Sequence, residues 1–171
     1  MRVIGLITLL LIGATQQSFG KAAFYGPDWM IRNAECIAIV HITVVHMNSP
    51  GARGKVWTYR QSASATVERV FKGALSKEVT LQGGEDFICA QVHYQPGRHL
   101  VFLKRDGHLL HAINWHLGVR PITGDQVEWF SDSGKSVLAA APAPLSKVIT
   151  VLQEQLARER STDSPLPGSI P

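Results

Sequence analysis

Residues 57–73 read WTYRQSASATVERVFKG, and the alternation within this stretch decides the fold. Six hydrophobic side chains share one parity, namely Trp57, Tyr59, Ala63, Ala65, Val67 and Phe71. Six polar side chains share the other, namely Thr58, Arg60, Ser62, Ser64, Thr66 and Glu68. A period of two over this length predicts a long, half-buried β-strand that ends at Lys72-Gly73.

The neighbouring segments extend the β pattern in both directions. Residues 36–47 are rich in Ile, Val and Thr on both parities, which predicts a strand covered on both sides for much of its length. Shorter strands are predicted at residues 78–82, 87–94, 99–104 and 109–115, the last two joined by a hairpin at Asp106-Gly107.

Five or six strands with short turns favour a mainly β protein that closes on itself. Closure removes the unpaired strand edges that otherwise promote aggregation, so an OB-like, closed or nearly closed antiparallel barrel is the first choice. A β-sandwich is the alternative, because alternation alone does not distinguish a closed barrel from two packed sheets.

The two ends of this β region predict helices. Pro27 suits the first position of a short helical turn over residues 28–33. Near the carboxyl end, an apolar stripe at helical spacing predicts an amphipathic helix over residues 144–160, packed on the barrel; its members are Leu145, Val148, Ile149, Leu152 and Leu156. The run Ala139 to Ala143 is expected to be a connector, and residues 161–171 a disordered tail.

The amino-terminal residues indicate export. Arg2 precedes an apolar run over residues 3–12 and then small and polar residues through Gly20, which is typical of a secretory signal peptide at residues 1–20. The run is shorter than the roughly 20 residues that cross a bilayer as a helix. The sequence therefore predicts a secreted or periplasmic protein with one barrel domain over residues 21–143 and no stable membrane insertion after signal removal.

The net charge and the cysteine content restrict the kinds of partner and of cross-link that we expect. The formal net charge of +4 is a mild excess spread along the chain, so no nucleic-acid partner is expected. Cys36 and Cys89 are the two cysteines, and an even count in an exported chain favours a disulfide between them.

Several segments occur in an order that resembles the netrin-like family, whose best-known members are the tissue inhibitors of metalloproteinases. The segments are Asn33 to Glu35 at the opening of the first strand, Phe71 to Gly73, Cys89, and His99 to Leu103. The resemblance covers residues 29–129 and implies an OB-like barrel with a tendency toward protein binding.

One feature of the inhibitors in that family is missing. Their mature amino-terminal cysteine places its amine and carbonyl on the zinc of the target protease. After the predicted cleavage this chain begins Lys21-Ala22-Ala23, so the resemblance does not extend to zinc chelation.

Candidate site residues fall into two groups. His108, His111 and His116 lie close together in sequence and are weak candidates for a metal site, because His111 has the opposite strand parity to the other two. Candidates for binding a partner are two aromatic residues expected at the surface and four basic residues in turns, namely Trp129, Phe130, Arg53, Lys55, Lys104 and Arg105.

These observations favour an exported, non-catalytic module that binds another exported protein, with an inhibitor-like role toward an extracytoplasmic enzyme as its most specific form. No Gly-x-Ser-x-Gly elbow or zinc-ligand spacing occurs in the sequence, and no cofactor is expected. The alternatives are a histidine-based metal-binding protein and a hydrolase whose site is assembled in space.

Overall fold

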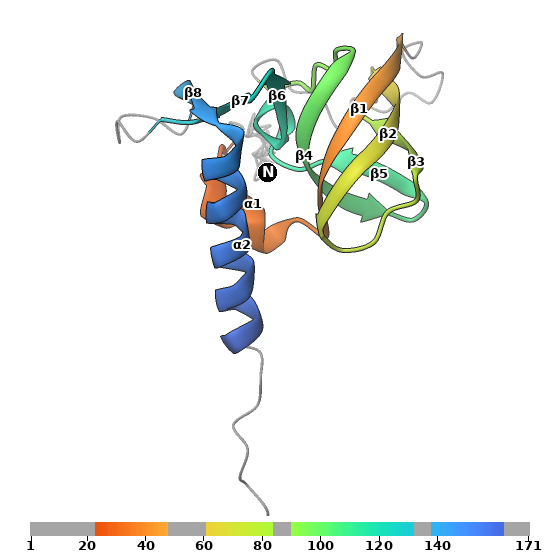
Figure 1. Ribbon diagram of the computed structural model, residues 1–171. Helices are drawn as coiled ribbons and strands as arrows, with labels where there is room; N and C mark the ends of the chain where they lie inside the picture. Colours follow the sequence, from red (N-terminus) through yellow and green to blue (C-terminus); the bar gives the residue numbers. More distant parts are fainter. Residues whose placement is uncertain (1–22, 48–60, 84–89, 132–137, 163–171) are drawn as a thin grey trace, which may run out of the picture.

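The computed structural model describes residues 23–47, 61–83, 90–131 and 138–162 (Figure 1). The elements are, in order, α1 (Pro27–Asn33), β1 (Cys36–Met47), β2 (Gln61–Lys72), β3 (Glu78–Gln82), β4 (Gly97–Asp106), β5 (Leu109–Ala112), the 3-10 helix η1 (Trp115–Gly118), β6 (Val119–Thr123), β7 (Gln126–Phe130), β8 (Ala140–Pro144) and α2 (Leu145–Thr162).

Five strands close into a barrel in the order β1-β2-β3-β5-β4, with β4 pairing back onto β1. All neighbours are antiparallel except β3 and β5, which are parallel at Leu81 and Leu110. The OB-like barrel with a carboxyl-terminal helix is therefore confirmed, and the β-sandwich alternative is wrong because β4 pairs with β1 through seven consecutive residue pairs.

The first part of β1 and the middle of β4 are buried on both faces, as the two apolar parities of residues 36–47 predict for part of that strand, whereas the second half of β1 is largely exposed. Ile37 and Ile39 belong to one hydrophobic cluster together with Phe102 of β4. Ala38 and Val40, on the opposite face of β1, belong to a second cluster that includes the barrel residues Val92, Leu81 and Ala63. The paired strands β1 and β4 thus separate the barrel interior from a second hydrophobic core outside the barrel.

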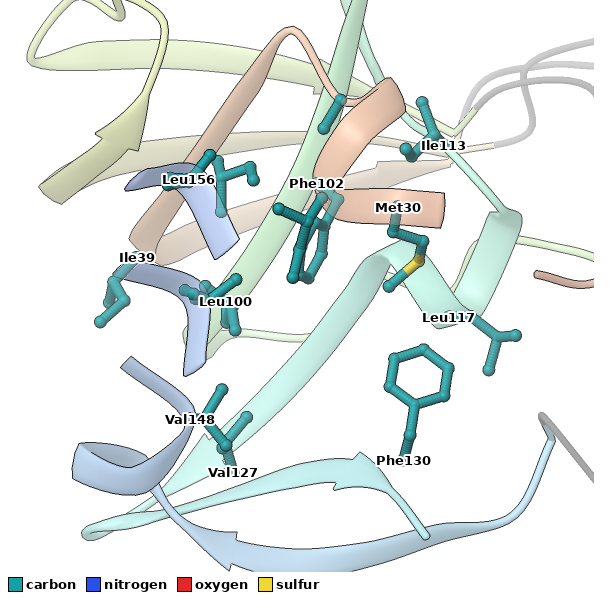
Figure 2. Packing of buried hydrophobic residues seen from close by; sticks show 14 of the residues in the cluster. Met30, Ile39, Leu100, Phe102, Ile113, Leu117, Val127, Phe130, Val148 and Leu156 are labelled. Atoms are coloured by element: carbon teal, nitrogen blue, oxygen red, sulfur yellow. The ribbon is translucent and has the colours of Figure 1, made fainter. Parts of the chain in front are cut away.

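The second core is covered by β6, β7, β8 and the two helices. In Figure 2, Phe102 and Leu100 of β4 lie among Met30 of α1 and Val148 and Leu156 of α2. Val148, Leu152 and Leu156 are buried in this cluster, so the apolar stripe of α2 serves as core. Within the described residues, no helix is both long and apolar enough to span a membrane.

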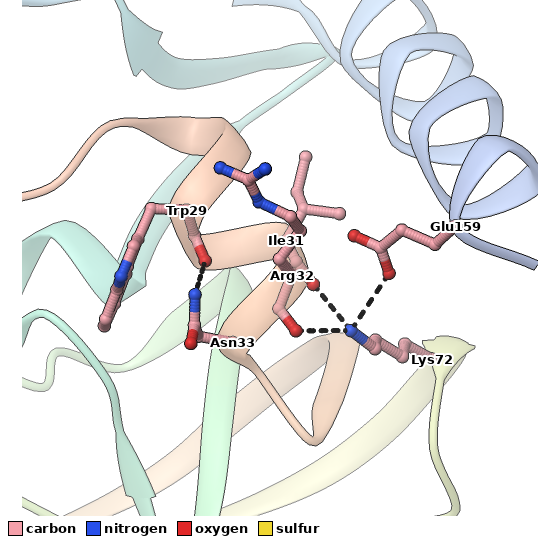
Figure 3. A network of polar contacts seen from close by, with 6 residues as sticks. All are labelled: Trp29, Ile31, Arg32, Asn33, Lys72 and Glu159. Atoms are coloured by element: carbon pink, nitrogen blue, oxygen red, sulfur yellow. Dashed lines mark hydrogen bonds and ion pairs between the residues drawn. The ribbon is translucent and has the colours of Figure 1, made fainter. Parts of the chain in front are cut away.

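A single lysine joins the barrel to both helices (Figure 3). Lys72 Nζ, at the end of β2, donates hydrogen bonds to the carbonyl oxygens of Ile31 at 2.7 Å and Arg32 at 2.9 Å. It also lies 3.3 Å from Oε2 of Glu159 on α2. A positive charge at the carboxyl end of α1 is favourable, because the unsatisfied carbonyls of a helix end carry partial negative charge.

Two strand predictions are wrong in detail. Of the predicted strand at residues 87–94, the described part contains one isolated bridge at Ala90. The reason is that side-chain and backbone groups outside a ladder satisfy Tyr94: its amide donates to Gln61 Oε1 at 2.8 Å and its hydroxyl to the Gln82 carbonyl at 2.7 Å. The strand predicted to reach Trp115 ends at Ala112, because Asn114 and Trp115 take positive φ angles and begin a 3-10 helix.

The run of residues 139–143 is not a simple connector. Most of it forms β8, which pairs with β7 from Phe130↔Ala140 to Gln126↔Pro144. Alanine and proline argue against a strand in sequence reasoning, but an edge strand tolerates prolines whose missing amide would face solvent.

Candidate functional site

A pocket of about 370 Å³ lies where the barrel meets the β6–β8 extension. It is lined by residues from β4, η1, β6, β7, β8 and the segment that precedes β4; they are His93, Gln95, His99, His116, Leu117, Val119, Arg120, Pro121, Glu128, Leu138 and Ala140. Three histidines and one arginine therefore line one concavity, although they come from four separate parts of the chain.

Arg120 is the unusual member of this set. It lies on β6 opposite Leu100 of β4 and is only 3% exposed. Its guanidinium carbon is 4.4 Å from the centre of the Phe130 ring, a cation–π arrangement. Its Nε and Nη2 atoms are shielded from solvent and have no hydrogen-bond partner among the described residues.

The charge of Arg120 survives this burial. Burial lowers the pKa of Arg120 to about 10, and attraction to Glu128 opposes that shift. The guanidinium is therefore protonated at neutral pH. A buried cation with unsatisfied donors is unfavourable in general; among the described residues the Phe130 ring and the attraction of Glu128 offset the charge in part, while Nε and Nη2 are left without acceptors.

The histidines beside Arg120 are held neutral at neutral pH. The pKa of His99 is lowered by burial and further by His41, against the effect of its hydrogen bond with the Gly97 carbonyl. The pKa of His116 is lowered by burial and then by the positive Arg120 and by His93. The Nδ1 atom of His99 lies 3.0 Å from the Gly97 carbonyl oxygen, which can only accept, so Nδ1 carries the proton and Nε2 is left with the lone pair.

Together these groups can hold an anion. The guanidinium supplies a positive charge and N–H donors at Nε and Nη2, and a neutral His116 imidazole can donate one hydrogen bond, whereas the N–H of His99 is already used on the Gly97 carbonyl. Glu128 is exposed and carries the opposite charge at the edge of the same pocket.

A second cavity, of about 270 Å³, lies between the two helices and is lined by Asp28, Arg32, Gln155, Arg158 and Glu159. Its acidic groups already have partners: Asp28 accepts a hydrogen bond from Gln155, and Glu159 pairs with Lys72. The pocket that contains Arg120 is therefore the better candidate for a functional site.

The predicted aromatic surface is not found. Phe130 is 9% exposed, and its ring lies under the guanidinium of Arg120, so the expectation that it is a surface residue is wrong. Trp129 is half-buried and packs against the second core, with its ring centre 6.2 Å from that of Phe102. The physical reason is that both faces of β7 are covered at residues 129 and 130: Trp129 packs toward Phe102 in the second core, and Phe130 packs against Arg120 of β6.

The predicted basic residues are dispersed. Lys104 and Arg105 are exposed at the end of β4, away from the pocket lining. Arg105 Nη2 donates to the Ala74 carbonyl at 2.8 Å, which ties it to the connection between β2 and β3. Arg53 and Lys55 lie outside the described residues.

The three histidines predicted as weak metal candidates are not brought together. His108 lies in the turn between β4 and β5, His111 is on β5 opposite Lys104, and His116 is in η1 against the Phe24 ring. Across residues 23–47, 61–83, 90–131 and 138–162, no group of three or more His, Cys, Asp or Glu side chains is placed to hold a metal ion. The opposite parity of His111 already argued against a shared site, and the turn and the 3-10 helix separate the three side chains further.

Cys36 is buried in the barrel interior, and its Sγ lies 3.7 Å from the Ala74 carbonyl oxygen. Cys89, the other half of the predicted disulfide, lies outside the described residues. The disulfide therefore stays a prediction.

His93, His99, Arg120 and Glu128 were not among the residues that the sequence singled out. The available signal was the position of Arg120, one charged residue within the otherwise uncharged stretch from Leu117 to Thr123. A charged residue in a strand is either exposed or buried with a functional role, and the sequence does not distinguish the two cases.

The comparisons with known proteins add no relative. No protein-family model matches the chain, and no curated protein is significantly similar to it.

Proposed function

We propose that this protein is an exported, non-catalytic binding module that engages a protein partner through the Arg120 pocket, with an inhibitor-like role toward an extracytoplasmic enzyme as the most specific form. The observation that carries the proposal is the buried guanidinium of Arg120, which lines a pocket and has two donors without partners among the described residues. A protein keeps such a group when binding compensates it.

Two further observations support a binding role. The amino-terminal segment has the layout of an export signal. The pocket lies at the junction between a closed barrel and its extension, where rigid strands on both sides hold its lining in place. Within the described residues, the histidines predicted for metal binding are not assembled, so the metal-binding alternative gains no support.

The test is affinity capture from the native exported fraction with the full mature chain as bait. The proposal predicts a stoichiometric partner that the wild type retains and the variant Arg120→Met loses. Arg98→Met is the matched control, because Arg98 is on the neighbouring strand but pairs with Glu68 at 3.0 Å and does not line the pocket.

Two results would count against the proposal. The first is the absence of any stoichiometric partner for the wild-type bait. The second is a partner that Arg120→Met and wild type retain equally well, since the pocket would then take no part in binding.

A further inference from the structure

The two unpartnered atoms of Arg120 belong to the same edge of its guanidinium. Nε–H and Nη2–H point in nearly the same direction within the plane of the group, and together they form its two-pronged side-on edge. This edge matches the two oxygens of a carboxylate or of a phosphate, which it binds through two parallel hydrogen bonds.

The other contacts of Arg120 leave this edge available. The Phe130 ring lies against the face of the guanidinium at 4.4 Å and fixes its plane without using an N–H. Nε and Nη2 expose almost no surface in this structure, so a ligand in the pocket that Arg120 lines contacts them only when the side chains over this edge move aside.

The charges around the pocket select between the two anions. His99 and His116 have lowered pKa values and are neutral at pH 7, which leaves Arg120 as the cation among the described lining residues, with Glu128 at the edge. A phosphate group carries −1.5 to −2 charge at neutral pH, more than one guanidinium compensates. A carboxylate adds a single negative charge beside Arg120 and Glu128, so Glu128 repels it less than it repels a phosphate.

We propose that the side-on edge of Arg120 binds one carboxylate group bidentately in this pocket, with the His116 imidazole beside it as a further hydrogen-bond donor. The inference rests on the proposed function, because it names the chemical group that the partner presents. The source of the carboxylate is a glutamate or aspartate side chain of the partner or a free small acid, and the two share this chemistry.

The experiment is an NMR titration of the full mature chain labelled with ¹⁵N, following the Arg120 Nε–H signal and the ring protons of His99 and His116. The probes are N-acetyl-glutamate amide as a side-chain mimic, acetate as a small acid, and inorganic phosphate. N-acetyl-glutamine amide, a neutral isostere, and sodium chloride at equal ionic strength are the controls.

The proposal predicts saturable shifts with the glutamate mimic and acetate, no saturation with the glutamine mimic or chloride, and weaker binding of phosphate. Tighter binding of the glutamate mimic than of acetate identifies a protein side chain as the source, and the reverse order identifies a small acid. Arg120→Lys keeps the charge but loses the two-pronged edge, so we expect its affinity to fall at least tenfold. Arg98→Met is expected to bind like the wild type.

Saturable binding that persists unchanged in Arg120→Lys, or phosphate binding tighter than that of either carboxylate, overturns the proposal. Failure of both carboxylates while partner capture still depends on Arg120 overturns this inference and leaves the proposed function standing. Saturable carboxylate binding without any captured partner overturns the proposed function and leaves this inference standing.

Discussion

At the scale of the residue, Arg120 is the clearest departure from what folding alone favours. Its Nε and Nη2 atoms lie buried with no hydrogen-bond acceptor in the part of the chain that the structure describes, and its charge is retained. Buried charges in proteins are ordinarily paired or exchanged for apolar groups of similar size, so the exception points to a role outside the folded chain itself.

This view predicts that Arg120→Met does not destabilise the protein. The variant loses a cation–π contact worth about 2 kcal/mol when desolvated, and it removes a desolvation penalty of several kcal/mol. We expect a free energy of unfolding in urea equal to or above that of the wild type. A loss of more than about 2 kcal/mol would mean that Arg120 stabilises the fold and is not held for a ligand.

A pair of glycines tests the packing at the end of β2. Gly73 and Gly107 both have positive φ, at 73° and 58°, so alanine is strained at either position. An added Cβ at Gly73 would collide with the Glu35 carbonyl oxygen and lie 2.8 Å from Cys36 Sγ, whereas at Gly107 it would meet nothing within 4 Å.

We therefore expect Gly107→Ala to lower the free energy of unfolding by about 1 kcal/mol and Gly73→Ala to lower it by about 3 kcal/mol or more. Urea denaturation of the two variants measures the difference. Similar losses would show that the contact between Gly73 and the start of β1 is not tight.

Two of the three pocket histidines, His99 and His116, predict the pH dependence of stability. Their pKa values are lowered from 6.5 in the folded state, so between their folded pKa and 6.5 the unfolded chain binds more protons than the folded one. The contribution of these two histidines to stability should therefore be complete above pH 7. The free energy of unfolding should fall as the pH drops below about 6.5. The charged and titratable groups that act on them are His41, His93 and Arg120.

Urea denaturation at pH 8, 7, 6 and 5.5 measures this effect above the range in which carboxylates titrate. The double variant with His99→Gln and His116→Gln should show a flatter profile. A wild-type profile that rises as the pH falls would contradict the assignment of these two histidines as neutral.

At the scale of the element, the structure depends on how β2, α1 and α2 meet at Lys72. The lysine satisfies two carbonyls at the end of α1 and pairs with Glu159 of α2. The two helices cover the second core, so a loose junction would expose it.

Lys72→Met should lower the free energy of unfolding by about 2 kcal/mol, because hydrogen bonds that involve a charged group are worth about 1.5–3 kcal/mol and the helix carbonyls lose their donor. Glu159→Gln should lower it by less than about 1 kcal/mol, since a partly exposed ion pair contributes little. Urea denaturation distinguishes the two. Equal losses would mean that the ion pair with Glu159, and not the hydrogen bonds to the end of α1, accounts for the stabilising effect of Lys72.

Strands with a clear period could be predicted from the sequence, and the others could not. The bounds of β1 and β3 agree with the prediction, because β1 carries apolar residues on both faces and β3 ends at a Gly-Gly pair. The strand at residues 140–144 was not predicted, because its prolines remove the usual strand signal. The strand predicted to reach Trp115 ends early because Asn114 adopts a left-handed conformation, which the sequence pattern does not indicate.

At the scale of the whole molecule, the OB-like closure could be predicted but the pocket could not. The pocket needs the β4–β6 pairing to bring Arg120 beside Leu100, and it needs β7 to bring Phe130 and Glu128 to the same place. Arg120 stands out as one charged residue in an uncharged stretch, but nothing in the local sequence connects it with Phe130 or Glu128. Their combination arises from tertiary register, which a single sequence does not reveal.

Export and the disulfide make a further prediction at this scale. Intact mass analysis of the exported protein should give a chain that starts at Lys21 and is two hydrogens lighter before reduction. Closing a loop of roughly 50 residues contributes about 4 kcal/mol in the chain-entropy model, so reduction should lower the melting temperature markedly. An uncleaved chain with two free thiols would contradict both expectations.

The measurement that tests the central claim most directly is elution of the captured partner by a carboxylate at constant ionic strength. If the partner inserts a carboxylate against Arg120, N-acetyl-glutamate amide should release it in a saturable way, while sodium chloride and N-acetyl-glutamine amide should not. Release that follows ionic strength alone, equally for chloride and the glutamate mimic, would contradict the claim that this pocket recognises a carboxylate of its partner.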